Sequence, residues 1–134
     1  MDVVSTFKLL GINIDHTLSF NDHVRKIKAQ INKKIFVLMK LSYLSQSVKM
    51  NFFKSFILPH FDYCSSLVVF MKKKQIASLE KYFNLCLHRL FNFDLFHLNI
   101  NTQFDFLKKY NILPLRLRLF VRLNKFVYKS VNNL

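Results

Sequence analysis

Apolar residues recur at steps of three and four along much of this chain, which is the spacing of one face of an α-helix. The clearest case gives one apolar face to a helix that starts near residue 21, and this face carries Val24, Ile27, Ile31, Ile35 and Leu38. A second helix is predicted over residues 75–91, where the same spacing joins Ile76, Leu79, Phe83, Cys86 and Leu90. The chain is therefore expected to be mainly α-helical.

Residues 7–14 differ, because they alternate loosely between apolar and polar and hold the only glycine, Gly11. Asp15–His16 then has the composition of a turn. Residues 1–18 are thus predicted to form a short β-strand or hairpin arm, ahead of a helical region over 19–134 in the same single domain.

Side chains that can accept a hydrogen bond from a helix N-terminus mark the expected starts of the first two helices. Ser19 or Asn21 can cap the first, and Ser45 or Ser47 can cap the second. The second helix carries Val48, Phe52, Phe53, Phe56 and Ile57. Pro59 should kink or stop it, because proline has no backbone donor.

The last third of the chain predicts two more helices. Asn99–Thr102 is a polar break, after which Thr102 can cap a short helix with Phe104 and Leu107 turned inward. A turn over residues 111–114 then places Pro114 at the first position of a helix that runs to about Val131. The expected fold is a short β element followed by about five amphipathic helices.

Charge adds a candidate function to this picture. The chain has 21 Lys and Arg against seven Asp and Glu, a formal charge of +14, and it has no acidic residue between Asp22 and Asp62 or after Asp105. Such acid-free basic stretches suit a polyanion, which is either a nucleic acid or an anionic membrane surface.

The positive charge gathers on two helices. On the first, Lys26, Lys33 and Lys40 lie opposite the apolar face, with Arg25 and Lys28 on one flank. On the last, one stripe is basic and consists of Arg118, Arg122, Lys125 and Lys129. The opposite face there holds Leu119, Phe120, Leu123, Phe126, Val127 and Ser130. These nine basic residues are the predicted nucleic-acid contacts, although a charged helix face is often only a solvated surface.

Candidate catalytic chemistry is sparse in the sequence. The seven acidic residues are scattered singly, whereas two-metal phosphoryl transfer needs clustered carboxylates. Asp15 and Asp22 fit turn or cap roles, and His60 with Cys64 lacks the further ligands of a zinc site. Neither a G-x-S-x-G elbow nor a glycine-rich phosphate loop occurs, so no catalytic residue, metal or other cofactor is expected in this chain.

Two further expectations concern the cysteines and the membrane. Cys64 and Cys86 lie among apolar residues and are expected to be reduced core thiols. The most apolar stretch, residues 55–71, contains Pro59, His60 and Asp62, so no transmembrane segment is predicted.

Two motifs give the chain a family resemblance. Phe7–Val24 reads FKLLGINIDHTLSFNDHV and Phe53–Ser66 reads FKSFILPHFDYCSS. They resemble the KxLGxxxD…LxFxxHV and KSxILPHFDYCS stretches that follow the catalytic core in reverse transcriptases of non-LTR (LINE-type) retrotransposons. The likeness continues through Leu79–Arg89 and Leu113–Asn133, so it covers nearly the whole chain.

The resemblance implies parts of a polymerase without its catalytic centre. Phe7, Leu10 and Gly11 match the primer-grip hairpin, and the helices look like the thumb that clasps the template–primer duplex. The family's catalytic aspartates, one pair in a Tyr-x-Asp-Asp turn, lie in an upstream palm that these 134 residues do not contain. The implied partners are an RNA/DNA template–primer duplex and that palm, and Mg²⁺ is expected only in the palm.

An alternative of another class remains open. The combination of 16 Phe with a charge of +14 also suits a non-enzymatic basic helical protein that binds an anionic membrane or a protein partner through its Phe-rich faces.

Overall fold

The computed structural model describes residues 6–63, 65–92 and 100–132. It confirms the predicted fold class. Strands β1 (Thr6–Leu9) and β2 (Ile12–Asp15) form an antiparallel hairpin in which Phe7 is opposite Ile14 and Leu9 is opposite Ile12. The helices follow as α1 (Asn21–Lys40), α2 (Gln46–Phe52), α3 (Leu58–Asp62), α4 (Lys73–Phe91), α5 (Ile100–Lys109) and α6 (Leu115–Val131). A π-helical turn, η1 (Phe53–Ile57), joins α2 to α3, and a 3₁₀ turn, η2 (Ser65–Leu67), follows α3.

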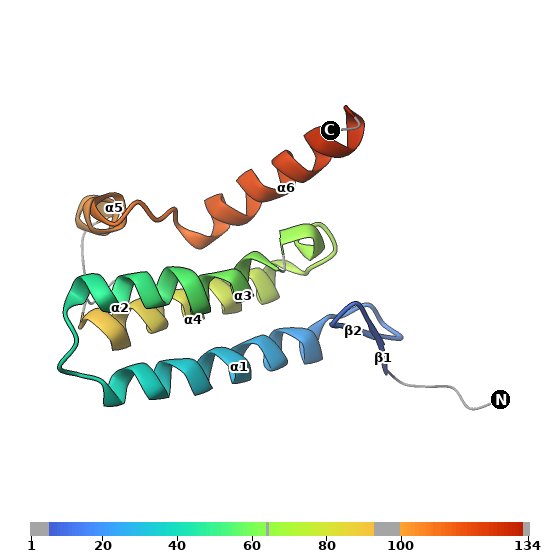
Figure 1. The fold of residues 1–134 in the computed structure, drawn as a ribbon. Coiled ribbons are helices and arrows are strands. Elements are labelled where there is room, and N and C mark those ends of the chain that lie inside the picture. The colour runs from blue at the N-terminus through green and yellow to red at the C-terminus, as the bar shows by residue number, and fades with distance from the viewer. Residues whose placement is uncertain (1–5, 64, 93–99, 133–134) are drawn as a thin grey trace.

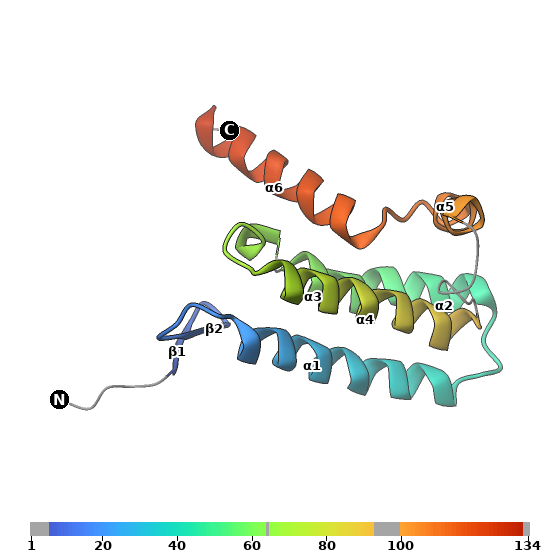
Figure 2. The same cartoon turned by 180° about the vertical axis from the view of Figure 1, so that it is seen from behind.

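The helices are arranged in layers (Figures 1 and 2). α2, α3 and α4 form the middle of the molecule, with α1 packed along one side and α6 along the other. The hairpin sits at the N-terminal end of α1, and α6 diverges from the body toward its C-terminal end. The largest fully buried side chains come from α1, η1, α3, α4 and the first half of α6, so the core lies between these elements.

The apolar face predicted for α1 is the face that the structure buries. Its five predicted residues are all inside the core, and Ile31 is completely inaccessible. Full burial of a side chain of this size contributes about 1.5–3 kcal/mol. On α4 the predicted residues are buried as well, except Ile76, which is only partly buried. Cys86 is a buried thiol there, as predicted, and burial raises its pKa to about 12.

Of the two predicted effects of Pro59, a kink or a stop, the stop does not occur. The helix continues through Asp62, and the disturbance takes the form of the π-helical turn η1 immediately before the proline. In that turn the N–H of Leu58 donates to the carbonyl of Phe53, five residues earlier. Pro59 then occupies the first turn of α3, where a missing donor is tolerated.

The turn predicted at Asp15–His16 is present, since the N–H of Leu18 donates to the carbonyl of Asp15 at 2.9 Å. The hairpin itself turns at Leu10–Gly11, where both residues have positive φ (47° and 83°), as in a type I′ turn. The caps depart from the predictions in part. The N-cap of α1 is Phe20, in the left-handed region, and neither Ser19 nor Asn21 occupies that position. Ser45 does cap α2, since its hydroxyl accepts the N–H of Val48 at 3.4 Å.

Further corrections concern helix faces and the later helices. Val48 and Phe56, two of the apolar residues predicted in the second helix, are both exposed. Thr102 lies inside α5, two residues after its first residue, and Phe104 is exposed, whereas Leu107 is buried. Pro114 is the N-cap of α6, one position before the predicted place. The predictions for Cys64 and Asn99 fall outside the described residues.

No helix in the described parts of the chain combines the length and the apolar character needed to cross a membrane.

Candidate nucleic-acid interface

Three lysines on α1 form a row that faces away from the core, and we call this row the α1 ridge. It consists of Lys26, Lys33 and Lys40, with Lys33 and Lys40 exposed and Lys26 half-buried. The row arises because a seven-residue step is almost two full helical turns, which keeps the three side chains on one line roughly 21 Å long. Lys40 Nζ lies 4.5 Å from the centre of the Phe36 ring, which orients the last ammonium group of the ridge.

The two flank residues of α1 have different environments. Arg25 is exposed and forms an ion pair with Asp22 at 3.3 Å. Lys28 instead reaches the α1–α4 interface, where its Nζ donates to Ser78 Oγ at 2.5 Å and lies 5.5 Å from the centre of the Tyr82 ring. Burial lowers the pKa of Lys28. Lys28, predicted on one flank of the basic face, therefore joins two helices.

The basic stripe of α6 lines one groove, which we call the α6 groove. Its volume is about 510 Å³, and its wall includes all four predicted residues: Arg118, Arg122, Lys125 and Lys129. Ser65, from η2, also lines the groove. The structure thus brings the stripe together in one concave surface.

A buried carboxylate neutralises part of the positive charge of the α6 groove. Asp62, only 9% exposed, accepts from Arg118 Nε at 2.6 Å and from Arg118 Nη2 at 2.7 Å. Arg122 Nη2 lies 2.8 Å from the same carboxylate. Bidentate Arg–carboxylate pairs are strong and geometrically specific. Arg118 therefore fastens α6 to α3, and the free positive charge of the groove lies mainly on Lys125 and Lys129.

The ridge and the groove do not form one continuous surface. α1 and α6 pack against opposite sides of the layer that contains α3 and α4 (Figures 1 and 2). Each basic surface is therefore available to a polyanion separately.

The hairpin residues with the primer-grip resemblance lie at the tip and on β1. Phe7 is exposed, and Leu10 is 82% exposed. The carbonyl of Leu10 accepts a hydrogen bond from the hydroxyl of Tyr63, which follows α3. Gly11 lies under the same hydroxyl, because a Cβ at this position would be 3.3 Å from it. Tyr63 thus fixes the hairpin tip to the end of α3.

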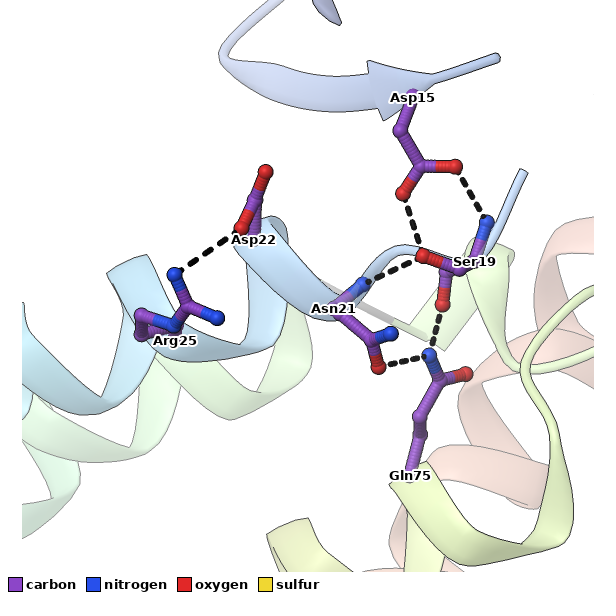
Figure 3. A network of polar contacts seen from close by, with 6 residues as sticks. All are labelled: Asp15, Ser19, Asn21, Asp22, Arg25 and Gln75. Carbon is purple, nitrogen blue, oxygen red and sulfur yellow. Dashed lines mark hydrogen bonds and ion pairs between the residues drawn. The ribbon is translucent and has the colours of Figure 1, made fainter. Parts of the chain in front are cut away.

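A polar network fixes the other end of the hairpin to α1 (Figure 3). The carboxylate of Asp15 accepts from the backbone N–H of Ser19 at 2.8 Å and from its hydroxyl at 2.5 Å. Together with hydrogen bonds from Thr17, these hold the pKa of Asp15 well below its usual range. The side chain of Asp15 is thereby committed to the turn that leads into α1.

Gln75, on α4, connects that helix to the same network at the start of α1. Its buried amide donates to the carbonyl of Ser19 and, at 2.8 Å, to Asn21 Oδ1 (Figure 3). Its carbonyl oxygen accepts the N–H of Lys72 at 3.0 Å. The NH₂ group of Gln75 thus holds the start of α1 against the start of α4, while its carbonyl oxygen caps α4 itself.

Sequence reasoning missed three residues that hold elements of this structure together: Gln75, Lys34 and Asp62. Gln75 stands three residues after Lys72, which is the spacing of a capping box and could have indicated its bond to that N–H. Lys34, whose Nζ donates to the Phe56 carbonyl at 2.9 Å and lies 2.7 Å from His60 Nε2, gave no local signal. Asp62 and its arginine partners are more than fifty residues apart, so no local pattern connects them.

Two negative observations complete the description. Among the residues that the structure describes, no three His, Cys, Asp or Glu side chains converge as metal ligands would. Comparisons of the chain with protein-family models, with curated proteins and with solved structures found no match.

Proposed function

We propose that this chain is the nucleic-acid-holding helical segment of a non-LTR retrotransposon reverse transcriptase. In this proposal it binds the template–primer duplex through phosphate contacts without reading the base sequence, and it is inactive as a polymerase by itself. The palm of the parent enzyme would supply the catalytic aspartates and hold Mg²⁺. The motifs of Phe7–Val24 and Phe53–Ser66 support the family.

The α1 ridge is the observation that carries the binding proposal. None of its three lysines is paired with a carboxylate of the described residues, so their charge is available to a ligand. A ridge of roughly 21 Å matches the rise of about six base pairs at 3.4 Å each. Flexible ammonium groups in such a row can contact phosphates of one strand but cannot distinguish bases.

The test is the salt dependence of duplex binding by a triple variant. Changing Lys26, Lys33 and Lys40 together to Gln removes up to three phosphate contacts. On B-form DNA each contact contributes about 0.9 to the slope of log K against log salt, so the slope should fall by about 2–3 units. Base sequence should have little effect.

A matched control variant removes three positive charges from helices outside the two basic surfaces. Lys74, Lys81 and Lys108 are exposed lysines of α4 and α5 that lie outside both basic surfaces. Changing these three to Gln should alter the slope much less. If the slope of log K against log salt falls equally in the two triple variants, the protein binds through its net charge and the ridge is only a solvated face.

The membrane-binding alternative has one structural observation in its favour. The C-terminal half of α6 exposes Phe126, Tyr128 and Val131 beside Lys125 and Lys129, as a helix that lies on an anionic bilayer does. Binding to anionic vesicles should therefore be measured beside binding to duplex at the same salt concentration. Tighter binding to vesicles would favour this second function.

A further inference from the structure

A small basic pocket lies where the hairpin, α1 and the end of α3 meet, and we call it the hairpin pocket. Its volume is about 300 Å³, the lower end of the range for ligand pockets. Polar side chains from three elements line it: Lys8, His23, Lys26, Gln30, His60 and Tyr63. A pocket of this size suits a small polar group more than a base or a ring system.

The charge in this pocket is positive and uncompensated. Its lining contains the ammonium groups of Lys8 and Lys26 and no carboxylate, and neither lysine pairs with a carboxylate in the described part of the chain. The closest acidic residue along α1, Asp22, is already paired with Arg25. Two like charges that line one half-enclosed pocket favour a bound anion of charge near −2.

The two histidines of the pocket add no positive charge to it. Burial lowers the pKa of His23, and the neighbouring charge of Lys26 lowers it further. The pKa of His60 is lowered by burial and by Lys34, whose Nζ lies 2.7 Å from its Nε2. Both rings are therefore neutral at pH 7, so the lysines supply the charge of the pocket. An anion bound beside them would raise both pKa values.

A hydrogen bond between Tyr63 and the hairpin tip fixes one wall of the pocket. The hydroxyl of Tyr63 donates this bond to the carbonyl of Leu10 and so holds the hairpin tip over the end of α3. The absence of a side chain at Gly11 keeps this side of the pocket clear. Gln30 adds an amide that can donate to an oxygen of the ligand.

We propose that the hairpin pocket binds one phosphate monoester group between Lys8 and Lys26, with Gln30 as a neutral donor. A monoester carries a charge of about −1.5 to −2 at pH 7 and three acceptor oxygens, whereas a diester within a strand carries only one charge. Lys26 also begins the α1 ridge, so a terminal phosphate of a strand on the ridge can enter the pocket directly. This last step rests on the proposed function, but binding of free phosphate does not.

The first experiment titrates the protein with inorganic phosphate at constant ionic strength and follows the ring protons of the histidines by NMR. Saturable shifts of the His23 and His60 signals are expected, with a rise in the pKa of both rings. Lys8→Gln should weaken phosphate binding about tenfold or more, because it removes one charge-assisted contact. Lys74→Gln, on α4 outside the pocket, is the control and should change it less than about twofold.

The second experiment identifies the source of the phosphate group. A duplex with a 5′-phosphate should bind more tightly than the same duplex without it, and Lys8→Gln should abolish that preference. If phosphate binds but the phosphorylated end gives no preference, the pocket takes free phosphate and end capture is wrong. If neither histidine responds to phosphate, or if Lys8→Gln and Lys74→Gln behave alike, the pocket proposal is wrong even where the ridge still binds duplex.

Discussion

The strongest structural prediction concerns Asp62, whose carboxylate joins α3 to α6. Asp62→Asn keeps the shape of the side chain but removes its charge and one of its two acceptor oxygens. The wild-type carboxylate has three contacts with guanidinium nitrogens, at 2.6, 2.7 and 2.8 Å. In the variant an amide NH₂ group replaces one oxygen and faces a guanidinium, so at least one donor of Arg118 or Arg122 loses its partner.

The burial of the three side chains sets the size of the effect. Removing one partner of a buried pair costs about 3–5 kcal/mol. Asp62 is 9% exposed and the Arg118 side chain 19% exposed, but the Arg122 side chain is 48% exposed and water can replace its lost contact. We therefore expect a loss of about 2–3 kcal/mol in the free energy of unfolding. For a chain of this length that corresponds to roughly 7–11 °C in Tm.

The assay is urea unfolding followed by far-UV circular dichroism, with Glu80→Gln as the control. Glu80 pairs with Arg116 at 3.1 Å between the same two layers, but the Arg116 side chain is 67% exposed. Losing this surface pair should cost less than about 1 kcal/mol. If Asp62→Asn is no less stable than Glu80→Gln, the salt bridge does not fasten α6 to the body and the reasoning is refuted.

Three further predictions test other parts of the structure. Gly11→Ala should destabilise the protein by about 1–3 kcal/mol in the same urea assay, because a residue with a Cβ is strained at φ 83° and would crowd the Tyr63 hydroxyl; an unchanged midpoint would contradict this. Stability should fall as pH decreases from about 7 to 5, because the lowered pKa values of His23 and His60 let the unfolded chain bind more protons than the folded one; a His60→Gln variant should show a shallower decrease, and an equal decrease would refute the assignment. The purified chain should not extend any primer, because its acidic residues are scattered singly along the sequence; extension above a control without protein would refute the proposed inactivity.

The local periodicity of the sequence predicted those parts of the fold that depend on one helix alone. The five-residue face of α1 is buried as predicted, because a core helix needs one continuous apolar stripe. The turn at Asp15–His16 is present as predicted, but the turn of the hairpin itself, at Leu10–Gly11, was not identified. Leu10–Gly11 is not one of the usual Asn-Gly or Asp-Gly pairs of such turns.

Contacts between distant segments were beyond the reach of such patterns. The sequence placed Phe120 and Phe126 on a packing face of the last helix, yet both are more than half exposed because α6 diverges from the body. Arg118 was expected to face a ligand and instead contacts Asp62. A helical wheel shows which residues share a face, but it does not show which element that face meets.

The central claim is that duplex nucleic acid lies along the α1 ridge, and lysine footprinting tests it most directly. The protein would be treated with an amine-modifying reagent, with and without a blunt duplex that lacks terminal phosphates, and the modified lysines would be measured by mass spectrometry. We predict that the duplex protects Lys33 and Lys40 several-fold, while Lys74 and Lys108 react as in the free protein. Equal protection of all four lysines, or protection that spares the ridge, would contradict the account.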